Sequence, residues 1–430
     1  MKKINHTRRL ILILLMIFVA LPVSLSAENF PDLTTKDIIR AEYFGKVVSS
    51  RNGQPLASAY LSVNGTNIST VTNNDGEFSL KVPDNLTDVT VTVSHLGYRS
   101  KTLPLDYFRG DDVVVELDES MEELSEVAIF TYTDPQAVVK NMLRNRGSNY
   151  FTESLDMTAF YRETIKRGRK NVSLSEAVVT IHKTPYSNTV SDKISLIKAR
   201  KTADYDRLDT LALKLRGGPY NTVNIDLMKN PDFMFRNEGL NNYKFSFDPP
   251  TRINDRYLYV VNFEELAKDY PWYFGKLYID AENFTLVKGS FNLNVDNRAA
   301  ATALFVKKKP GGTKVYPISV HYDIEYRERD GRWYFGYGKT DLEFVVNWKR
   351  RLFNSRYRVN SELAVTDWQP AEGKFKRDEN YINPNIVMID DVSGFADVAF
   401  WGENNIIEPD ESIEKAIDKI RKNLEENNQL

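Results

Sequence analysis

Apolar and polar side chains alternate with a period of two along much of the chain, which is typical of β-strands with one buried face. Between residues 42 and 118, seven short segments of this kind are separated by turn residues such as Asn52-Gly53. In one segment Val89, Val91 and Val93 alternate with threonine and serine. An Asn-Gly pair supplies the positive φ angles of a tight hairpin turn. The pattern therefore predicts a seven-stranded β-sandwich over residues 42–118.

A longer alternating series follows in residues 134–400 and predicts a second domain. Asp134 and Pro135 have the N-cap and first-turn chemistry of a helix that opens this domain. About ten strands joined by short hairpins follow, among them a strand at 301–307 and a hairpin turn at Asp330-Gly331. A further helix is expected at 205–215. Such a sheet must curl to bury one face. The predicted fold class is mainly β: a seven-stranded β-sandwich plus a larger curved antiparallel sheet with a few packing helices (α+β).

Two shorter segments complete the predicted organisation. Residues 119–133 form an acidic linker between the domains, and residues 401–430 form a docking segment with a C-terminal helix. The apolar residues of this helix recur at spacings of three and four, at Ile413, Ala416, Ile417, Ile420 and Leu424. We expect this stripe to cover an apolar face of the sheet, and the alternative is that it pairs with a helix of a partner.

The first 27 residues have the pattern of a secretory signal peptide. Lysines and arginines precede the apolar run 10–21, and small residues follow up to Ala27. The run is shorter than the ~20 residues that span a bilayer. Cleavage near Ala27 would give an exported chain in the periplasm or associated with the outer membrane. The alternative is an uncleaved anchor.

Composition narrows the class of protein further. With 430 residues, 42% of them hydrophobic and 27% charged, the chain is long enough for two folded domains. Its formal charge of -2 provides no field that would recruit nucleic acid. We therefore expect no nucleic-acid partner. The chain contains no cysteine, so disulfides and a lipid-modified cysteine are excluded, and the cores alone must hold the fold.

Five motifs in the predicted sandwich occur in order, at 45–48, 53–59, 63–66, 74–78 and 93–98. Together they resemble the carboxypeptidase regulatory-like domain, a transthyretin-like β-sandwich. The region is similar to the copy at the N-terminus of TonB-dependent nutrient transporters in the Bacteroidetes. This resemblance implies a non-catalytic accessory module, although the rest of the chain is too short for the membrane barrel of those transporters.

The hairpin from Gly275 to Lys288 resembles the central hairpin of the outer-membrane lipoprotein carrier superfamily. In that family a curved antiparallel sheet wraps helices and cups an acyl chain, so the resemblance implies the same architecture for residues 156–367. The two-domain order as a whole resembles Bacteroidetes envelope proteins of unassigned function.

Candidate catalytic chemistry is sparse. None of the four histidines, His6, His95, His182 and His321, is followed by glutamate three residues later, as a zinc peptidase motif requires. The segment 73–76 is interpreted as a plain turn because a calcium loop would need further ligands. Asp323 and Glu325 share one strand face and could serve glycosidic cleavage, although solvated carboxylates are the favoured interpretation. We therefore predict no catalytic residue, no metal and no cofactor.

Six residues are candidates for contact with a ligand or a membrane. Four are aromatic residues of strands, which could stack on sugar rings, and two are arginines of a basic cluster, which could contact anionic lipid. They are Trp272, Tyr273, Trp333, Trp348, Arg350 and Arg351. The competing interpretations are that the rings form the core and that the arginines lie on a solvated hairpin tip.

These observations favour a non-enzymatic cell-envelope protein. The sandwich would be an interaction module joined to a scaffold or apolar-ligand-binding sheet, in outer-membrane biogenesis or nutrient uptake. The alternatives are a carbohydrate-binding accessory protein and a hydrolase. The expected partner is an outer-membrane or periplasmic protein, with a lipid or a glycan as candidate ligands.

Overall fold

In the computed structural model the described residues belong to one compact unit, which begins at Arg40. The structure describes residues 40–426 except for 111, 121–130, 204–217, 236–238, 254–255, 268–269, 307–310, 350–352, 385–394, 396 and 398. The predicted signal peptide, most of the predicted linker and the predicted helix at 205–215 lie outside the described residues.

The N-terminal domain is a sandwich of seven strands, as predicted. One sheet has the order β4-β1-β7 and the other has the order β3-β2-β5-β6. Strands β1 and β7 are parallel, and the remaining pairs are antiparallel. The strands are β1 (Arg40–Ser49), β2 (Tyr60–Val63), β3 (Ser69–Val71), β4 (Glu77–Pro83), β5 (Thr90–Ser94), β6 (Lys101–Pro104) and β7 (Val114–Leu117). A 3-10 helix, η2 (Leu105–Arg109), precedes β7.

The second domain is built on one ten-stranded sheet in which every neighbouring pair is antiparallel. This confirms the predicted large antiparallel sheet. Its strands are β8 (Leu155–Arg167), β9 (Lys170–Lys183), β10 (Lys193–Ala203), β11 (Tyr243–Ile253), β12 (Arg256–Glu265), β13 (Tyr273–Asp280), β14 (Leu286–Leu293), β15 (Thr313–Arg329), β16 (Arg332–Trp348) and β17 (Ser355–Pro370).

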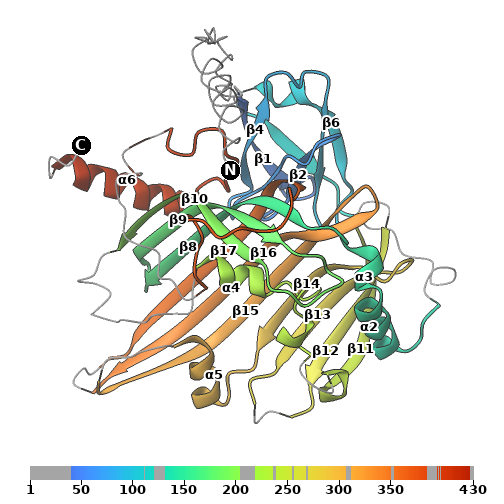
Figure 1. Cartoon of the computed structure of the whole chain (residues 1–430). Helices are drawn as coiled ribbons and strands as arrows, with labels where there is room; N and C mark the ends of the chain where they lie inside the picture. The colour runs from blue at the N-terminus through green and yellow to red at the C-terminus, as the bar shows by residue number, and fades with distance from the viewer. Residues whose placement is uncertain are drawn as a thin grey trace, which may run out of the picture. The chain divides into compact units, whose positions relative to one another are not determined.

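The strand order is β10-β9-β8-β17-β16-β15-β14-β13-β12-β11. After β10 the chain leaves one edge of the sheet and starts again at the other edge with β11. The meander from β11 to β17 then returns to pair β17 with β8, with Leu363 opposite Tyr161 (Figure 1). A pairing between the first and last strands of the domain closes a long stretch of chain into one sheet.

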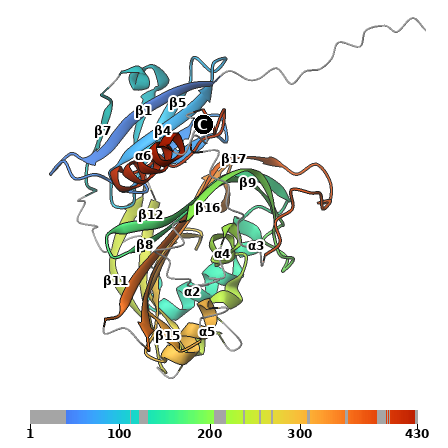
Figure 2. The same cartoon turned by 90° about the vertical axis from the view of Figure 1, so that its left-hand side faces the viewer.

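Helices α2, α4 and α5 lie inside the curve of the sheet (Figure 2). Helix α2 begins as predicted, because the Asp134 side chain accepts a hydrogen bond from the Gln136 amide and Pro135 is the first helical residue. The helices of this domain are α2 (Pro135–Arg144), α3 (Arg146–Asn149), α4 (Pro219–Asn224), α5 (Arg298–Phe305) and the 3-10 helices η3 (Pro231–Phe233) and η4 (Gly239–Asn242). Buried side chains of α2 and α4 form one core with the concave face of the sheet.

The prediction of a strand at 301–307 is wrong, because this part of the chain forms helix α5 (Arg298–Phe305). The Asn297 side chain caps the helix by accepting a hydrogen bond from the Ala300 amide. Three consecutive alanines follow Arg298. Alanine is the strongest helix former, so a capped alanine run overrides the short apolar alternation that suggested a strand.

The predicted hairpin between β15 and β16 is present. Asp330 and Gly331 have φ angles of 51° and 75°. Two consecutive positive φ angles define the type I′ turn, which Asp-Gly favours because its twist matches that of the strands. This turn sets the register of the two longest strands.

The last helix, α6 (Glu411–Glu426), lies on the outer face of the sheet, away from α2 and α4 (Figure 2). Ile413 and Ile417 are buried against Leu174 of β9 and Phe395. The stripe therefore covers an apolar part of the sheet, as expected. Among the helices that the structure describes, none combines the length and the apolar character needed to cross a membrane.

Candidate functional site

Strand β3 of the sandwich packs on β17, on the outer face of the large sheet. The Asn67 amide nitrogen Nδ2 donates to the Trp368 carbonyl at 2.8 Å, and the Ser69 hydroxyl donates to the Val365 carbonyl at 3.2 Å. Both bonds join a side chain of the sandwich to the backbone of the sheet. The junction is thus specified by polar contacts with fixed geometry.

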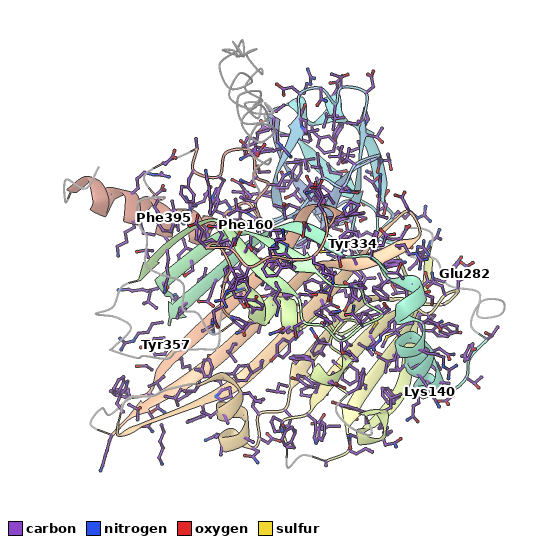
Figure 3. The ribbon with its side chains drawn as sticks, in the orientation of Figure 1. Lys140, Phe160, Glu282, Tyr334, Tyr357 and Phe395 are labelled. Atoms are coloured by element: carbon purple, nitrogen blue, oxygen red, sulfur yellow. The ribbon has the colours of Figure 1, made fainter. Side chains whose placement is uncertain are left out.

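Residues 401–410, here called the C-terminal strap, fill the angle between the two domains. Trp401, Ile406 and Ile407 are buried together with Val71 of β3 and Phe160 of β8. Figure 3 labels Phe160 beneath the strap. Burial of several large apolar side chains in one cluster is a major stabilising contribution to this junction.

The strap also forms hydrogen bonds to the sandwich. Asn405 Nδ2 donates to the Lys81 carbonyl at 3.1 Å, and the Lys81 amide donates to Asn405 Oδ1 at 2.6 Å. Thr70 Oγ1 donates to the Ile406 carbonyl at 3.1 Å. The strap therefore pairs with the sandwich through a reciprocal side-chain and backbone contact.

The turn at 73–76 receives the start of α6. Asn74 Nδ2 donates to Asp410 Oδ2 at 2.8 Å, and the Glu411 amide donates to Asp75 Oδ2 at 3.0 Å. Asp75 thus satisfies one of the amides that an α-helix leaves unpaired at its N-terminus. Sequence reasoning predicted the turn and the C-terminal helix, but not that the helix docks on the turn.

A buried ion network lies where the strap crosses β8 and β9. Arg162, only 1% exposed, donates from Nε to Glu176 Oε1 at 2.7 Å and from Nη2 to the Ile407 carbonyl at 2.8 Å. Arg200 donates from Nε to Glu176 Oε2 at 2.7 Å. Burial alone would raise the pKa of Glu176, but the two arginines hold it below its ordinary value. The network fastens the strap to the sheet.

A second ion network connects the sandwich to β14 and β15. Glu325 accepts hydrogen bonds from Lys288 at 2.9 Å and from Arg327 at 2.6 Å. The guanidinium carbon of Arg327 lies 4.1 Å from the centre of the Tyr60 ring on β2. Burial alone would raise the pKa of Glu325, but Lys288 and Arg327 lower it to about 2.

Asp323, the other carboxylate of the predicted pair, contacts His321 on the same strand. The His321 Nε2 to Asp323 Oδ2 distance is 3.1 Å, and Nδ1 of His321 lies 3.0 Å from Asn292 Oδ1. Burial would raise the pKa of Asp323, but the hydrogen bond with His321 lowers it overall. Glu325 is buried, so the expectation that both carboxylates are simply solvated is wrong for this residue.

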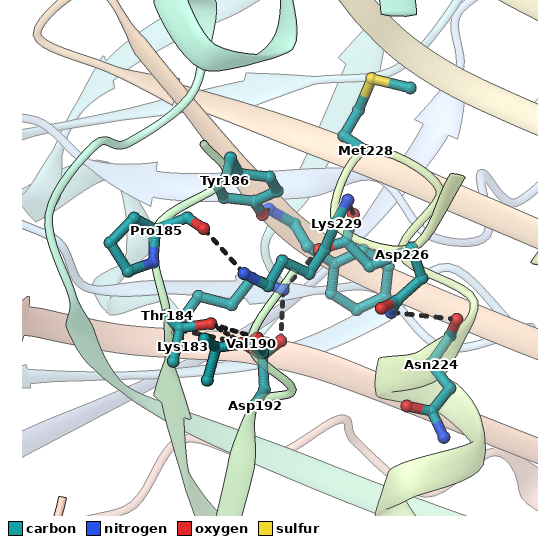
Figure 4. A network of polar contacts seen from close by, with 12 residues as sticks. Lys183, Thr184, Pro185, Tyr186, Val190, Asp192, Asn224, Asp226, Met228 and Lys229 are labelled. Atoms are coloured by element: carbon teal, nitrogen blue, oxygen red, sulfur yellow. Dashed lines mark hydrogen bonds and ion pairs between the residues drawn. The ribbon is translucent and has the colours of Figure 1, made fainter. Parts of the chain in front are cut away.

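The concave side holds a third polar network, shown in Figure 4. Lys183 donates to Asp192 at 2.8 Å and to Asp226 at 2.5 Å, and all three side chains are almost fully buried. The Tyr326 hydroxyl donates to Asp226 Oδ1 at 2.8 Å. Burial lowers the pKa of Lys229 to about 8, and its ammonium group donates to backbone carbonyls nearby. These bonds fix the segment after α4 to β9 and β15, which is a structural role.

The structure places the four predicted aromatic contact residues in the core or against it. Tyr273 and Trp333 are buried, and Trp272 and Trp348 are partly buried and pack against the same core. Arg350 and Arg351 lie outside the described residues. The competing interpretation of the rings as core residues fits these positions, and a contact role for the six residues stays a prediction.

Of the cavities lined by described residues, two larger ones open on the outer side of the sheet. The larger, about 660 Å³, lies between α6 and the β8–β9 hairpin, and we call it the α6 groove. The smaller, about 480 Å³, lies near the ends of β12 to β15. Phe274, 37% exposed, lines the smaller cavity together with Asn292, Asn294 and Glu264. In the part of the chain that the structure describes, no group of three or more histidine and acidic side chains is arranged to hold a metal ion.

The buried ion networks were missed in the sequence. A signal for them exists in the strand from Val172 to Ile181, where apolar residues occur on both faces. Such a strand is covered on both sides, so a charged residue within it must have a partner. Glu176 in this strand could have been recognised as a buried charge, although its partners Arg162 and Arg200 could not have been named.

Comparison with protein families identifies the class of the N-terminal domain. Residues 43–129 match the model of the CarboxypepD_reg-like domain. This finding confirms the resemblance carried by the five motifs between residues 45 and 98. The match is confined to the sandwich and the residues just after it. A search of curated proteins finds no match to the sequence.

Comparison with solved structures returns distantly similar proteins, among them a LolA superfamily protein. This protein, from Nitrosomonas europaea, is 10% identical, with 56% of this chain and 96% of that chain covered and a TM-score of 0.23. An outer membrane lipoprotein-sorting protein domain from Vibrio parahaemolyticus is 10% identical, with 56% and 94% covered and a TM-score of 0.25. The MucA/MucB complex of Pseudomonas aeruginosa gives 11% identity, 56% and 100% coverage and a TM-score of 0.17. Similarity at this level does not support an inference about shared function.

Proposed function

We propose that this chain is an exported, non-enzymatic protein of the cell envelope that serves as a binding scaffold in outer-membrane biogenesis or nutrient uptake. The observation that carries the proposal is the junction between the two domains. The C-terminal strap, the turn at 73–76 and the Glu325 network hold the sandwich against the outer face of the sheet. A sandwich fixed in this way can present its remaining surface to a partner in one orientation.

The charges of the carboxylate pair Asp323 and Glu325 do not suit glycosidic cleavage by this pair. Glycosidic cleavage needs one carboxyl group that stays protonated near neutral pH and acts as the general acid. The pKa of Glu325 is lowered to about 2 by Lys288 and Arg327, and the pKa of Asp323 is lowered by His321. Neither carboxylate of this pair can therefore supply the proton at neutral pH.

The experiment that tests the scaffold is thermal unfolding of residues 40–430, measured by calorimetry. We expect a single cooperative transition, because the sandwich and the sheet share buried contacts. Replacing Trp401, which is 5% exposed in the strap, by alanine should separate the transition into two. The control is Phe353→Ala, since Phe353 is 84% exposed. Two independent transitions in the unaltered protein would contradict the proposal.

Native purification followed by mass spectrometry tests the binding role. We expect a copurified lipid, glycan or envelope protein in a fixed ratio to the chain. If the unaltered protein hydrolyses a glycan and the folded variant Glu325→Gln does not, this result would instead support the hydrolase alternative.

A carbohydrate-binding role is the second candidate, and the cavity beside Phe274 favours it. A partly exposed ring next to the amides of Asn292 and Asn294 offers both a flat apolar surface and hydrogen-bonding groups for a sugar. A glycan screen with the full chain should then give a ligand whose binding is lost in Phe274→Ala. If the glycan screen finds no ligand, the scaffold remains the proposed function.

A further inference from the structure

The α6 groove is formed by two elements that lie far apart in the sequence. One wall is helix α6, and the other is the β8–β9 hairpin with the start of β9. The volume of about 660 Å³ lies in the range of about 300–1,000 Å³ that is typical of small-molecule sites.

The N-terminal end of α6 is held firmly at the groove. Lys166 Nζ donates to Ser412 Oγ at 2.9 Å, and Asn171 Nδ2 donates to the Ser412 carbonyl at 3.1 Å. The Ile413 amide donates to Asp410 Oδ1 at 3.0 Å, which caps the helix. These bonds join α6 to both strands of the β8–β9 hairpin, so the two walls of the groove have a defined separation.

The floor of the groove is apolar. Val172 and Leu174 of β9 face Ala416 and Ile420 of α6. Ile413 and Ile417 pack onto the sheet, whereas Ile420 is only partly buried. Alanine at position 416 leaves space that a larger side chain would fill. An apolar chain can therefore replace water along this floor.

The rim of the groove is cationic. Four basic side chains line it, and all four are exposed: Arg169, Lys170, Lys415 and Lys419. The one carboxylate among the lining residues is Glu411, which pairs with Lys415. The lining thus carries a net positive charge beside an apolar floor, although the whole chain has a formal charge of -2.

We propose that the α6 groove binds a single-chain lipid with an anionic head group. The acyl chain would lie on the floor between β9 and α6, and the head group would lie between the lysines of α6 and the basic residues of the β8–β9 hairpin. Cationic side chains at an apolar surface select an anionic amphiphile over a neutral one. This site goes beyond the scaffold proposed above, since it assigns a ligand and its place.

The test compares two lysolipids with the same acyl chain, below their critical micelle concentrations, by isothermal titration calorimetry with the full chain. We expect lysophosphatidylglycerol, which is anionic, to bind at least tenfold more tightly than zwitterionic lysophosphatidylcholine. The double variant Lys415→Gln/Lys419→Gln should lose this preference, because each lysine removed should weaken the affinity for the anionic lipid about fivefold.

Two further variants complete the design. Lys140→Gln/Arg144→Gln removes two positive charges, four residues apart, from the exposed face of α2, and Figure 3 labels Lys140 there. This control should bind as the unaltered protein does. Ala416→Trp fills the floor and should abolish binding of both lipids. If Ala416→Trp lowers the melting temperature, the comparison of the double lysine variant with the α2 control decides whether the site exists.

Four results would overturn the site: binding of neither lipid, equal affinity for the two lipids, equal effects of the rim variant and the α2 control, or competition by inorganic phosphate at the same concentration as the lipid. A single unfolding transition with no lipid binding would leave the scaffold proposal standing, so the two failures can be told apart.

Discussion

Replacing Arg162 by methionine tests whether the strap holds the two domains together. The arginine is buried and connects four groups: Glu176 at 2.7 Å, Glu362 at 3.6 Å, and the carbonyls of Ile407 and Glu408 at 2.8 and 3.3 Å. Methionine fills much of the same volume but offers no donor. Glu176 then keeps Arg200 as a cationic partner, while the two carbonyls of the strap lose their donor.

The expected loss of stability is large for one substitution. Removing one partner of a buried ion pair costs about 3–5 kcal/mol, and a buried carbonyl without a donor costs about 1–3 kcal/mol. Because Arg200 compensates in part, we expect a loss of about 4 kcal/mol. For a cooperative unit of about 390 residues, an unfolding entropy of about 2.1 cal/mol/K per residue converts this loss into a melting temperature about 5 °C lower.

Calorimetry and limited proteolysis of the strap are the assays. For Arg162→Met, calorimetry should show the lower melting temperature. Proteolysis should cleave the strap within residues 401–410 before the sheet unfolds. The triple variant in which Arg162, Glu176 and Arg200 all become methionine should regain at least half of the lost stability, since the buried Glu176–Arg200 pair is removed whole and only Glu362 still lacks Arg162. The control is Arg51→Met, because Arg51 is 65% exposed in a surface pair, where such pairs contribute at most about 1 kcal/mol. A fall of less than 1 °C, or a triple variant weaker than the single one, would refute the reasoning.

Three further substitutions test other parts of the structure. Burial raises the pKa of Glu408 to about 7, so between pH 4.5 and 7 the folded chain binds a proton that the unfolded chain has lost, and stability falls as pH rises. Glu408→Gln should therefore raise the melting temperature at pH 8 and leave it unchanged below pH 4.5. Lys183→Met leaves two buried aspartates without their cation and should cost about 3–5 kcal/mol by urea denaturation. At Gly275 the φ angle is 153° and an added Cβ would lie 2.4 Å from the Ser290 carbonyl oxygen, so Gly275→Ala should cost more than about 2 kcal/mol, unlike Gly311→Ala at an open position.

Local patterns were sufficient to predict most elements of the fold. The alternating valines of β5, the Asp-Gly turn at 330–331 and the cap at Asp134 each depend on neighbours a few residues away. The strand predicted at 301–307 failed for the same local reason, because a cap and three alanines favour a helix there. Where neighbouring residues determine the conformation, sequence reasoning has the information that it needs.

Long-range arrangement could not be predicted in the same way. The contacts of the strap with the turn at 73–76 join residues 336 positions apart, and no local pattern specifies them. The pairing of β8 with β17 is likewise hidden, since a meander suggests that strands adjacent in sequence are adjacent in the sheet. Asparagine and aspartate at 73–75 were interpreted as turn formers, and the same side chains also bind α6.

The candidate site depended on residue types whose burial cannot be read from one sequence. Tyr273 and Trp333 were candidates both for contact with a sugar and for the core, and the structure buries both, because alternate rings of a curved sheet point toward the helices that it wraps. The α6 groove joins basic residues at 169–170 with lysines at 415 and 419, and each pair alone resembles an ordinary solvated surface. A groove of mixed character emerges only when the helix is placed against the hairpin.

The two ion networks of the junction suggest why the sandwich is held by charges as well as by apolar contacts. An apolar surface alone tolerates sliding, because the hydrophobic effect has no direction. Arg162 and Glu325 instead accept few geometries, since any shift would leave a buried charge without its partners. We therefore expect the networks to define one orientation of the sandwich on the sheet. If the triple methionine variant keeps its stability but shows faster hydrogen exchange at β3 and β17, the charges specify the orientation, and the strap supplies the binding energy.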